Sequence, residues 1–374
     1  MELANQYIVE EFSGLRGLES VEDNWNKIWP SIARPSFYHL FAWYWSYTKY
    51  LDGTDGEISY YIVRTSSEPV AIVPVKRYER KLLGIPVLSL ETPDHNHLGL
   101  TDVILAEQSG ISSYAAIRKV VDSEATRRTA DVFRILENCE DSILGRGVDP
   151  EFAGRVIRNP VTKSKYIDCS ISYEEYLGKL TGRFKKNNRR KRRKAEKLGQ
   201  LQFHVLDSKQ DFDKAYDAFL ELEASGWKGE KGKSTAIKQH ENLRQFYENL
   251  HSRLQGEAEV IINSLELNGE CIAAQYCVVV AGTVHLLKIA FDENYSDVSP
   301  GFLLLDELTK VVCENPGLDR INFVTGASWN DDWKPETLVV NELIIVNRTF
   351  KGWMLLLAYR TKSFLKKLMK SSGG

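Results

Sequence analysis

The segment VHLLKIAFDENYSDVSPGFLLL, residues 284–305, is the most informative part of the chain. It begins with an apolar run, Val284–Ala290, that is typical of a strand. An acidic loop, Asp292–Asp297, follows, and Ser299, Pro300 and Gly301 then open an apolar helix. The first N–H groups of a helix lack partners and form the positive end of its dipole. The segment therefore predicts a cradle for a phosphate or pyrophosphate.

Turns and apolar runs on either side of this segment predict an α/β chain whose pattern occurs twice. In the second half, Asn268-Gly269 is a hairpin signal between two strands. The expected elements there are helices 173–198 and 212–222, strands 259–267, 271–280 and 283–290, a helix to about Cys313 and strand 320–324. The first half predicts helix 37–50, strands 58–64, 70–78 and 86–90, helix 113–125 and strand 132–136. Turn residues at Asn159-Pro160 predict two domains, 1–159 and 160–374.

Composition fits a globular protein with two cores. The 374 residues are 43% hydrophobic and 27% charged, and no run approaches 18 uncharged apolar residues. The first residues lack the basic and apolar regions of a signal peptide, so a cytoplasmic location is expected. Five scattered cysteines favour neither a disulfide framework nor a zinc site, and no metal is expected.

Several local patterns in residues 175–335 resemble tandem GNAT acyltransferases of the CelD-like or BioF-associated group, which are relatives of the FemAB-type aminoacyltransferases. The patterns are a basic helix ending RKAEKLG (193–199), LEASGWK (222–228), IAAQ (272–275), His285 with DENY (292–295), SPG (299–301) and Trp333-Lys334. The first half matches only in layout. The resemblance implies two GNAT-like domains, each with a mixed, mostly antiparallel sheet flanked by helices.

The resemblance also implies that acyl-coenzyme A donates an acyl group to an amine or hydroxyl. Its pyrophosphate would lie on the helix start formed by Val298, Ser299, Pro300, Gly301 and Phe302. The loop departs from the family pattern, since one glycine replaces two and Asp292, Glu293 and Asp297 surround it. The matching loop of the first half has no such glycine, so the first domain is expected to lack the cofactor.

Strand pairing suggests further site residues. If Ala281-Gly282 is a two-residue turn, Val280 opposes Thr283, and Gln275 opposes Lys288 on one face. Gln275 and Lys288 are then interpreted as a cleft-lining pair that binds acceptor or donor. His285 falls opposite Val278 on the other face.

Candidate proton acceptors are the carboxylates Asp292 and Glu293, which lie where the strand ends, and His285, whose pKa suits neutral pH. Each has a structural alternative, as a solvated turn acid or a core histidine. Five residues are interpreted as acceptor-side residues or as cover for the core: Trp227, Lys228, Trp329, Trp333 and Lys334. In the first half, Asp94 and His95 either contact the acceptor from a cleft between the domains or belong to an ordinary polar loop, and they form no complete metal-ligand set.

The segment 183–197 carries ten Lys or Arg and one Glu, about +9, within a chain of net charge −2. It is interpreted as a solvated helical face, a site for a polyanionic substrate or cofactor phosphate, an RNA site or a membrane contact. Nucleic acid is not the favoured partner of this segment, and transfer RNA would be the partner only if the chain were a FemAB-like enzyme. The long helical hairpin of FemA-like enzymes is not visible.

The C-terminal residues 350–370 combine Trp353, Leu357, Phe364 and Leu368 with Lys362, Lys366, Lys367 and Lys370. Such a helix either lies peripherally on an anionic membrane or packs against its own domain, and packing is favoured. The favoured function is acyl transfer from acyl-coenzyme A to an amine or hydroxyl, such as an amino sugar of an envelope polysaccharide. The alternatives are an aminoacyl-tRNA-dependent transferase acting on a peptidoglycan precursor and a noncatalytic polyanion-binding protein on a degenerate GNAT fold.

Overall fold

The computed structural model describes residues 7–53, 57–123, 130–147, 150, 152, 154–207, 210–254, 256 and 258–371. The chain forms two compact units. Unit 1 contains residues 1–162 and 338–374, and unit 2 contains residues 163–337. The chain passes from one unit to the other within strand β7 (Val156–Asp168) and returns within strand β13 (Glu336–Val346).

The course of β13 corrects the expected division at residue 159. We expected residues 160–374 to form one domain, but residues 338–374 belong to unit 1. The reason is a long-range pairing, because β13 runs antiparallel to β6 (Val132–Cys139), with Val346 opposite Val132. Ladder hydrogen bonds and the buried Leu343 and Ile345 hold this strand in the core of unit 1.

Unit 1 is built on an antiparallel meander that ends in a parallel pair. The meander consists of β1 (Ile8–Ser13), β2 (Ser59–Arg64), β3 (Pro69–Leu82) and β4 (Ile85–Glu91). Strand β4 pairs in parallel with β6, β6 pairs with β13, and the short β5 (Ile104–Leu105) adds to β3. The helices are α1 (Gly14–Ser20), α2 (Glu22–Ile28), α3 (Phe41–Tyr50), α4 (Ser113–Asp122) and α10 (Phe350–Ser371), with 3-10 turns at Trp29–Ser31 and Phe37–His39.

Unit 2 repeats this order. Its meander consists of β8 (Leu201–His204), β9 (Ala258–Leu267), β10 (Glu270–Val280) and β11 (Thr283–Phe291). Strand β11 pairs in parallel with β12 (Arg320–Asn322), which pairs antiparallel with β7. The helices are α5 (Tyr173–Lys179), α6 (Gly182–Glu196), α7 (Phe212–Ser225), α8 (Glu241–Arg253) and α9 (Pro300–Glu314), and the 3-10 segments are η4 (Ile237–Gln239), η5 (Glu293–Val298) and η6 (Ser328–Trp333).

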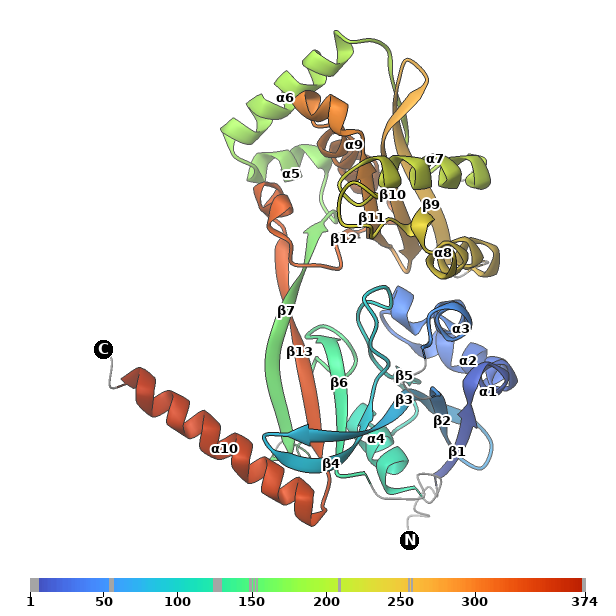
Figure 1. Cartoon of the computed structure of the whole chain (residues 1–374), viewed down its shortest axis with the longest axis vertical. Coiled ribbons are helices and arrows are strands. Elements are labelled where there is room, and N and C mark those ends of the chain that lie inside the picture. The colour runs from blue at the N-terminus through green and yellow to red at the C-terminus, as the bar shows by residue number, and fades with distance from the viewer. Residues whose placement is uncertain are drawn as a thin grey trace. The chain divides into compact units, whose positions relative to one another are not determined.

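In unit 2 the helices cover the sheet on both faces (Figure 1). Tyr276 of β10 packs against aromatic rings of α7 and α8, so these helices cover one face. Leu303 and Leu304 of α9 pack with Ala273 of β10 on the other face. The repeated order of meander, helix, parallel strand and antiparallel strand confirms the predicted α/β class, with mixed, mostly antiparallel strand pairing in each unit. The strand pairings join into one sheet and not into the two that the sequence predicted.

The two hairpin turns of unit 2 follow their sequence signals. Asn268 and Gly269 have φ values of 54° and 83°, and Ala281 and Gly282 have values of 46° and 80°. Positive φ at both central positions is the two-residue turn that matches the twist of paired strands. These turns join β9 to β10 and β10 to β11, so they fix the start of both ladders. Within the described part of the chain, no helix combines the length and apolarity needed to cross a membrane.

Candidate functional site

The site begins where β11 and β12 stop pairing. They pair at three positions only, Thr283 with Arg320, Val284 with Ile321 and His285 with Asn322. Strand β12 ends there, because the Asn322 side chain accepts the N–H of Val324 at 2.7 Å and Val324 turns away with a φ of 62°. Strand β11 continues to Phe291 along β10, so residues 286–291 have an edge that no recorded strand pairing covers.

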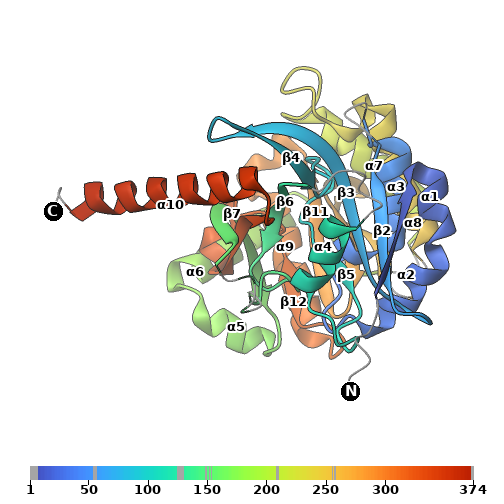
Figure 2. The same ribbon diagram turned by 90° about the horizontal axis from the view of Figure 1, so that it is seen from below.

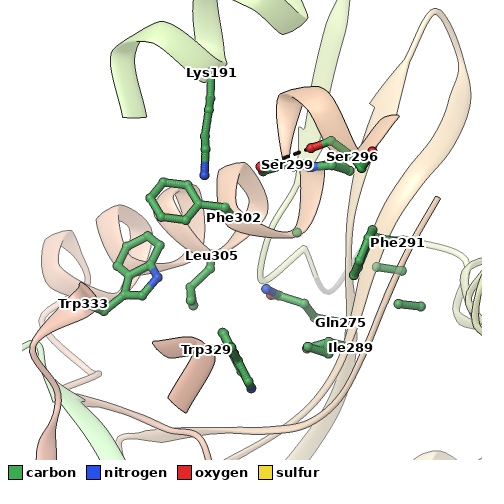
Figure 3. A pocket seen from close by; sticks show the side chains of 14 residues that line it. Lys191, Gln275, Ile289, Phe291, Ser296, Ser299, Phe302, Leu305, Trp329 and Trp333 are labelled. Atoms are coloured by element: carbon green, nitrogen blue, oxygen red, sulfur yellow. Dashed lines mark hydrogen bonds between the residues drawn. The ribbon is translucent and has the colours of Figure 1, made fainter. Parts of the chain in front are cut away.

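A pocket of about 360 Å³ lies in this opening (Figure 3). Its walls are mostly apolar and come from β10, β11, η5, the start of α9 and η6. One further side chain, Lys191, comes from α6. The lining residues are Lys191, Ala274, Gln275, Ile289, Ala290, Phe291, Ser296, Ser299, Pro300, Gly301, Phe302, Leu305, Trp329 and Trp333.

The start of α9 lies in this wall without a side-chain cap. Ser299 occupies the N-cap position in a left-handed conformation, with a φ of 52°, and its hydroxyl donates to the Ser296 carbonyl at 3.3 Å instead of accepting from the helix. Pro300 has no N–H, and the Gly301 N–H lies too early in the helix for an intrahelical acceptor. A Cβ on Gly301 would come no closer than 3.8 Å to Phe291, so its missing side chain leaves space on the pocket side.

Lys191 supplies a positive charge to the pocket. Helix α6 buries Phe184, Asn188 and Ala195, and Lys191 lies on the same face by helical spacing. Its Nζ lies 4.0 Å from the centre of the Phe302 ring, and Figure 3 shows the side chain pointing down towards that ring. Burial, and to a lesser extent the neighbouring Arg190, lowers the Lys191 pKa. The site therefore holds a partly desolvated cation, which favours an anionic ligand.

The acids of the cradle loop are all engaged outside the pocket. Asp297 pairs with Lys194 at 2.8 Å, and this hydrogen bond holds the pKa of Asp297 below its usual value. Asp292 accepts the Asn294 N–H at 2.9 Å, and Glu293 accepts the Trp227 N–H at 3.0 Å. None of the three lines the pocket, so their charges do not face a ligand there.

The structure corrects the predicted pairing of Gln275 with Lys288. Val280 opposes Thr283 and Val278 opposes His285, as expected. A bulge at Leu287 then shifts the register, so Tyr276 opposes Lys288 and Gln275 opposes Ile289. One extra residue moves every later side chain to the other face, which puts Gln275 and Lys288 on opposite faces of the sheet.

Gln275 is the buried polar group of the pocket. It is 2% exposed, and its Oε1 accepts a hydrogen bond from Asn263 at 3.2 Å. Figure 3 shows its amide pointing from β10 into the space between α9 and Trp329. With the oxygen held by Asn263, the amide nitrogen is positioned to donate to a ligand.

Lys288 lies on the opposite face, with a second lysine close by. Its Nζ is 5.7 Å from the centre of the Tyr247 ring, and burial together with the charge of Lys228 lowers its pKa to about 8. Lys228 donates to Glu223 at 2.8 Å and to the Ile289 carbonyl at 3.0 Å. The Ile289 carbonyl therefore points to the open edge of β11, and this face carries a lysine that titrates near neutral pH.

The remaining predicted residues lie in defined positions, and their roles stay predictions. His285 is 3% exposed and shares the face of Val278, away from the pocket. Lys334 donates to the Lys179 carbonyl at 2.7 Å, and the half-exposed Trp227 ring has Lys228 and Lys233 within 6 Å. Asp94 is exposed, and the His95 ring accepts the His97 N–H at 3.2 Å. No group of three or more metal-ligating side chains occurs within the described ranges.

Trp333 forms a wall of the pocket as well as part of the core. It is 1% exposed, and its ring packs against Phe184 and Phe302 at centroid distances of 5.0 and 4.7 Å. Trp329, which the sequence suggested as an acceptor-side residue, also lines the pocket, whereas Lys191, Ile289, Phe291 and Leu305 were not among the predicted site residues. Two patterns could have found some of them: the spacing of Lys191 from Phe184, and strand alternation from Gln275 across to Ile289 once the bulge is known.

Part of unit 2 is similar to a known protein family. Residues 182–335 match the family model described as "Acetyltransferase (GNAT) domain". This range contains α6, the meander from β8 to β11, α9 and the whole pocket. No curated protein matches the chain. The match supports an acyltransferase, whereas the narrower CelD-like or BioF-associated assignment stays a prediction.

Solved structures match nearly the whole chain. FemX is 12% identical with a TM-score of 0.55, and the match covers 87% of this chain and 96% of FemX. A conserved protein of unknown function from Bacteroides thetaiotaomicron is 14% identical with a TM-score of 0.53, over 87% and 97%. L-PGS from Bacillus licheniformis is 13% identical with a TM-score of 0.50, over 90% and 95%. At these identities the likeness shows a shared fold.

Proposed function

We propose that unit 2 transfers an acyl group from acyl-coenzyme A to an amine or hydroxyl. The observation that carries the proposal is the coincidence of three features in one pocket: an open strand edge, an uncapped helix start and a partly buried cation. An acyl chain fits the apolar walls, and a pyrophosphate fits the Gly301 N–H and Lys191. The cytoplasmic location expected from the sequence belongs to the same proposal.

The open edge of β11 offers a means to activate the thioester. The N–H and C=O of one strand residue point the same way, so the Ile289 N–H faces the open edge with its carbonyl. A backbone N–H held there can donate to the thioester oxygen and stabilise the charge that develops when the acceptor attacks. The carbon–sulfur bond then breaks, and coenzyme A leaves as the thiolate.

The acceptor must also lose a proton. Lys288 precedes Ile289 on the face away from the pocket, and with a pKa of about 8 it is partly neutral at cellular pH. We assign it this role ahead of Asp292 and Glu293, since both carboxylates already accept backbone N–H groups. An amino sugar of an envelope polysaccharide is the acceptor that the family resemblance favours.

Calorimetric titration with acetyl-coenzyme A and longer acyl esters tests the donor. We expect Gly301→Ala to raise the Kd about tenfold or more, because the new methyl group occupies the space of a close backbone contact. Gly178→Ala is the matched control, since this helical glycine of α5 also has no neighbour near its Cβ position. A wild-type protein that binds no acyl-coenzyme A would exclude the proposal.

A second candidate rests on the exposed face of α6. A groove there is lined by Gly182 and six cations, Lys186, Arg189, Arg190, Arg193, Lys194 and Lys197. This groove favours a polyanion, and an aminoacyl-tRNA donor would use it. Binding of transfer RNA that falls steeply with salt and is lost in Arg189→Glu/Arg193→Glu, without any acyl-coenzyme A binding, would make this the function. Polyanion binding without transfer of any acyl group would instead favour the noncatalytic alternative.

A further inference from the structure

Helix α10 carries most of the exposed apolar surface of the described chain. Thirteen large apolar side chains are recorded as exposed, and seven of them belong to this helix. Phe350, Trp353, Leu357 and Phe364 are 79%, 51%, 67% and 61% exposed. Intervals of three, four and seven residues place these four on one face of the helix. They form a continuous apolar stripe, which we call the α10 stripe.

The opposite face holds α10 against unit 1. Leu355 and Leu356 are buried with Val132, Ile344 and Val346. The Thr349 hydroxyl donates to Asp131 at 2.6 Å and accepts the Gly352 N–H at 3.0 Å, and Arg360 donates to the Gly154 carbonyl at 2.7 Å. The packing expected from the sequence is therefore present, but it uses Leu355 and Leu356 and leaves Trp353, Leu357 and Phe364 outward. The side chains of four residues named from the sequence are not among those that the structure describes: Lys366, Lys367, Leu368 and Lys370.

The charged residues of α10 outside the stripe are all basic. Residues 350–374 contain six Lys or Arg and no Asp or Glu. At about 100° per residue, Arg360 lies beside the stripe, whereas Lys351 and Lys362 lie on the polar face, roughly 130° and 150° from the centre of the stripe. All three residues are exposed. Figures 1 and 2 both show α10 extending away from the strands of unit 1, with its far end remote from them.

We propose that α10 docks unit 1 on an anionic lipid bilayer, with the α10 stripe in the interface and the cations of the helix attracted to the headgroups. An apolar face combined with Lys and Arg on the polar face is the pattern of a helix that lies in the membrane plane, and each cation near an anionic surface adds about 1 kcal/mol. Charge argues against a second copy of the stripe as the occupant. Two α10 helices face to face would bring twelve cations together, and neither helix has an acid to offset them.

Sedimentation of the full chain with vesicles tests this docking. We expect binding to equimolar phosphatidylglycerol and phosphatidylcholine, and at least about tenfold weaker binding to phosphatidylcholine alone. Leu357→Glu and Phe364→Glu should each weaken binding by a similar factor, because a carboxylate would enter the interface. Both residues are exposed, so the fold is expected to persist, with circular dichroism as the check. Val161→Glu, an equally exposed apolar position on β7, should bind like the wild type.

Lys351→Glu/Lys362→Glu separates charge from apolar contact and should weaken binding to anionic vesicles only. Equal binding of the wild type to both vesicle types, or unchanged binding by Leu357→Glu, would overturn the proposal. A dimer in analytical ultracentrifugation that Leu357→Glu dissociates, without vesicle binding, would assign the stripe to a second copy instead. None of these readouts uses acyl-coenzyme A, so they stand apart from the proposed transfer reaction.

Discussion

Units 1 and 2 share one strand order but end their parallel pair differently. In unit 1, the pairing of β4 with β6 ends at Glu91 and Arg134, and the loop after β4 remains hydrogen-bonded to β6. The Thr92 N–H donates to the Arg134 carbonyl at 2.9 Å, and the Thr101 N–H donates to the Glu137 carbonyl at 2.8 Å. In unit 2 the chain leaves β12 after Asn322, and the matching space is the pocket.

The helices that follow show the same contrast. Ser112 caps α4 from an extended conformation, and its hydroxyl accepts the Ala115 N–H at 3.1 Å. Ser299 at the start of α9 is left-handed and turns its hydroxyl back to Ser296. At these two places unit 1 provides its own hydrogen-bond partners, whereas unit 2 leaves a strand edge and a helix start open. A binding site thus arises on a repeated fold through the loops after two strands, without a change in the sheet.

The largest effect is expected from Asp102→Ala in unit 1. Asp102 is fully buried, and its carboxylate accepts the N–H groups of Val103, Ile143 and Leu144 at 2.9, 2.7 and 3.3 Å. Removing it leaves three buried donors without their acceptor, so we expect a loss of about 3 kcal/mol or more in the free energy of unfolding, measured with urea. The acyl-coenzyme A affinity of the folded protein should not change.

Glu68→Ala, an exposed carboxylate in the same unit, is the control for Asp102→Ala and should change stability by less than about 0.5 kcal/mol. If Asp102→Ala kept its stability but lost ligand binding, the closed loop of unit 1 would be part of the site.

Lys288→Met tests how much the buried charge of Lys288 destabilises the protein. The folded pKa of Lys288, about 8, lies below the unfolded value of about 10.4, so the unfolded state binds more protons between these pH values. The free energy of unfolding of the wild type should therefore rise with pH between these two values. Below about pH 8 Lys288 is charged in the folded state, and its charge destabilises the fold in full. We therefore expect Lys288→Met to be more stable than the wild type at pH 7, on the order of 1–3 kcal/mol, and this advantage should shrink towards pH 10.5.

Urea unfolding at pH 7 and near pH 10 measures this difference, with the exposed Lys81→Met as a control that should show no such trend. A Lys288→Met advantage independent of pH would show that packing, not charge burial, is responsible.

Lys191→Met should weaken acyl-coenzyme A binding about tenfold, close to 1.4 kcal/mol, because it removes the pocket cation while keeping the apolar contact with Phe302. Lys186→Met changes a lysine of the exposed α6 groove and should bind like the wild type. Equal losses in both variants would mean that the whole basic face of α6 holds the ligand. Calorimetry at one fixed ionic strength provides the comparison.

The smallest effects come from the two helix-start serines. Ser112→Ala should cost about 1 kcal/mol in stability, because α4 loses its cap. Ser299→Ala should cost less than about 0.3 kcal/mol, since its hydroxyl makes no cap hydrogen bond. Thermal unfolding of both variants in one buffer gives the ranking. Equal losses would contradict the contrast between a closed and an open helix start.

The sequence predicts local features of this fold well because turn chemistry is local. Asn268-Gly269 and Ala281-Gly282 place β9, β10 and β11 within one residue of their observed ends. The single division at residue 159 was wrong for a nonlocal reason, since the pairing of Val346 with Val132 spans more than two hundred residues. Periodicity carries no information about such a partner.

The site was predicted in part. The helix start from Val298 to Phe302, Gln275 and Trp333 were proposed from the sequence, and apart from Val298 all of these residues line the pocket. The predicted pairing of Gln275 with Lys288 was wrong because one bulged residue, Leu287, interrupts the two-residue alternation from which the register was counted. Lys191 was hidden within a run of cations, where charge alone does not show which residue faces inward.

The two passages of the chain through β7 and β13 bear on how the protein is made. Unit 2 is an uninterrupted segment, residues 163–337, inserted into unit 1. During synthesis the inserted segment is complete before β13 leaves the ribosome. Unit 1 therefore lacks its last sheet strand until after unit 2 has been made, although residues 1–162 of unit 1 are made first. We therefore expect nascent chains that end near residue 337 to acquire a protease-resistant unit 2 first. The unit with the open pocket would then precede the closed one.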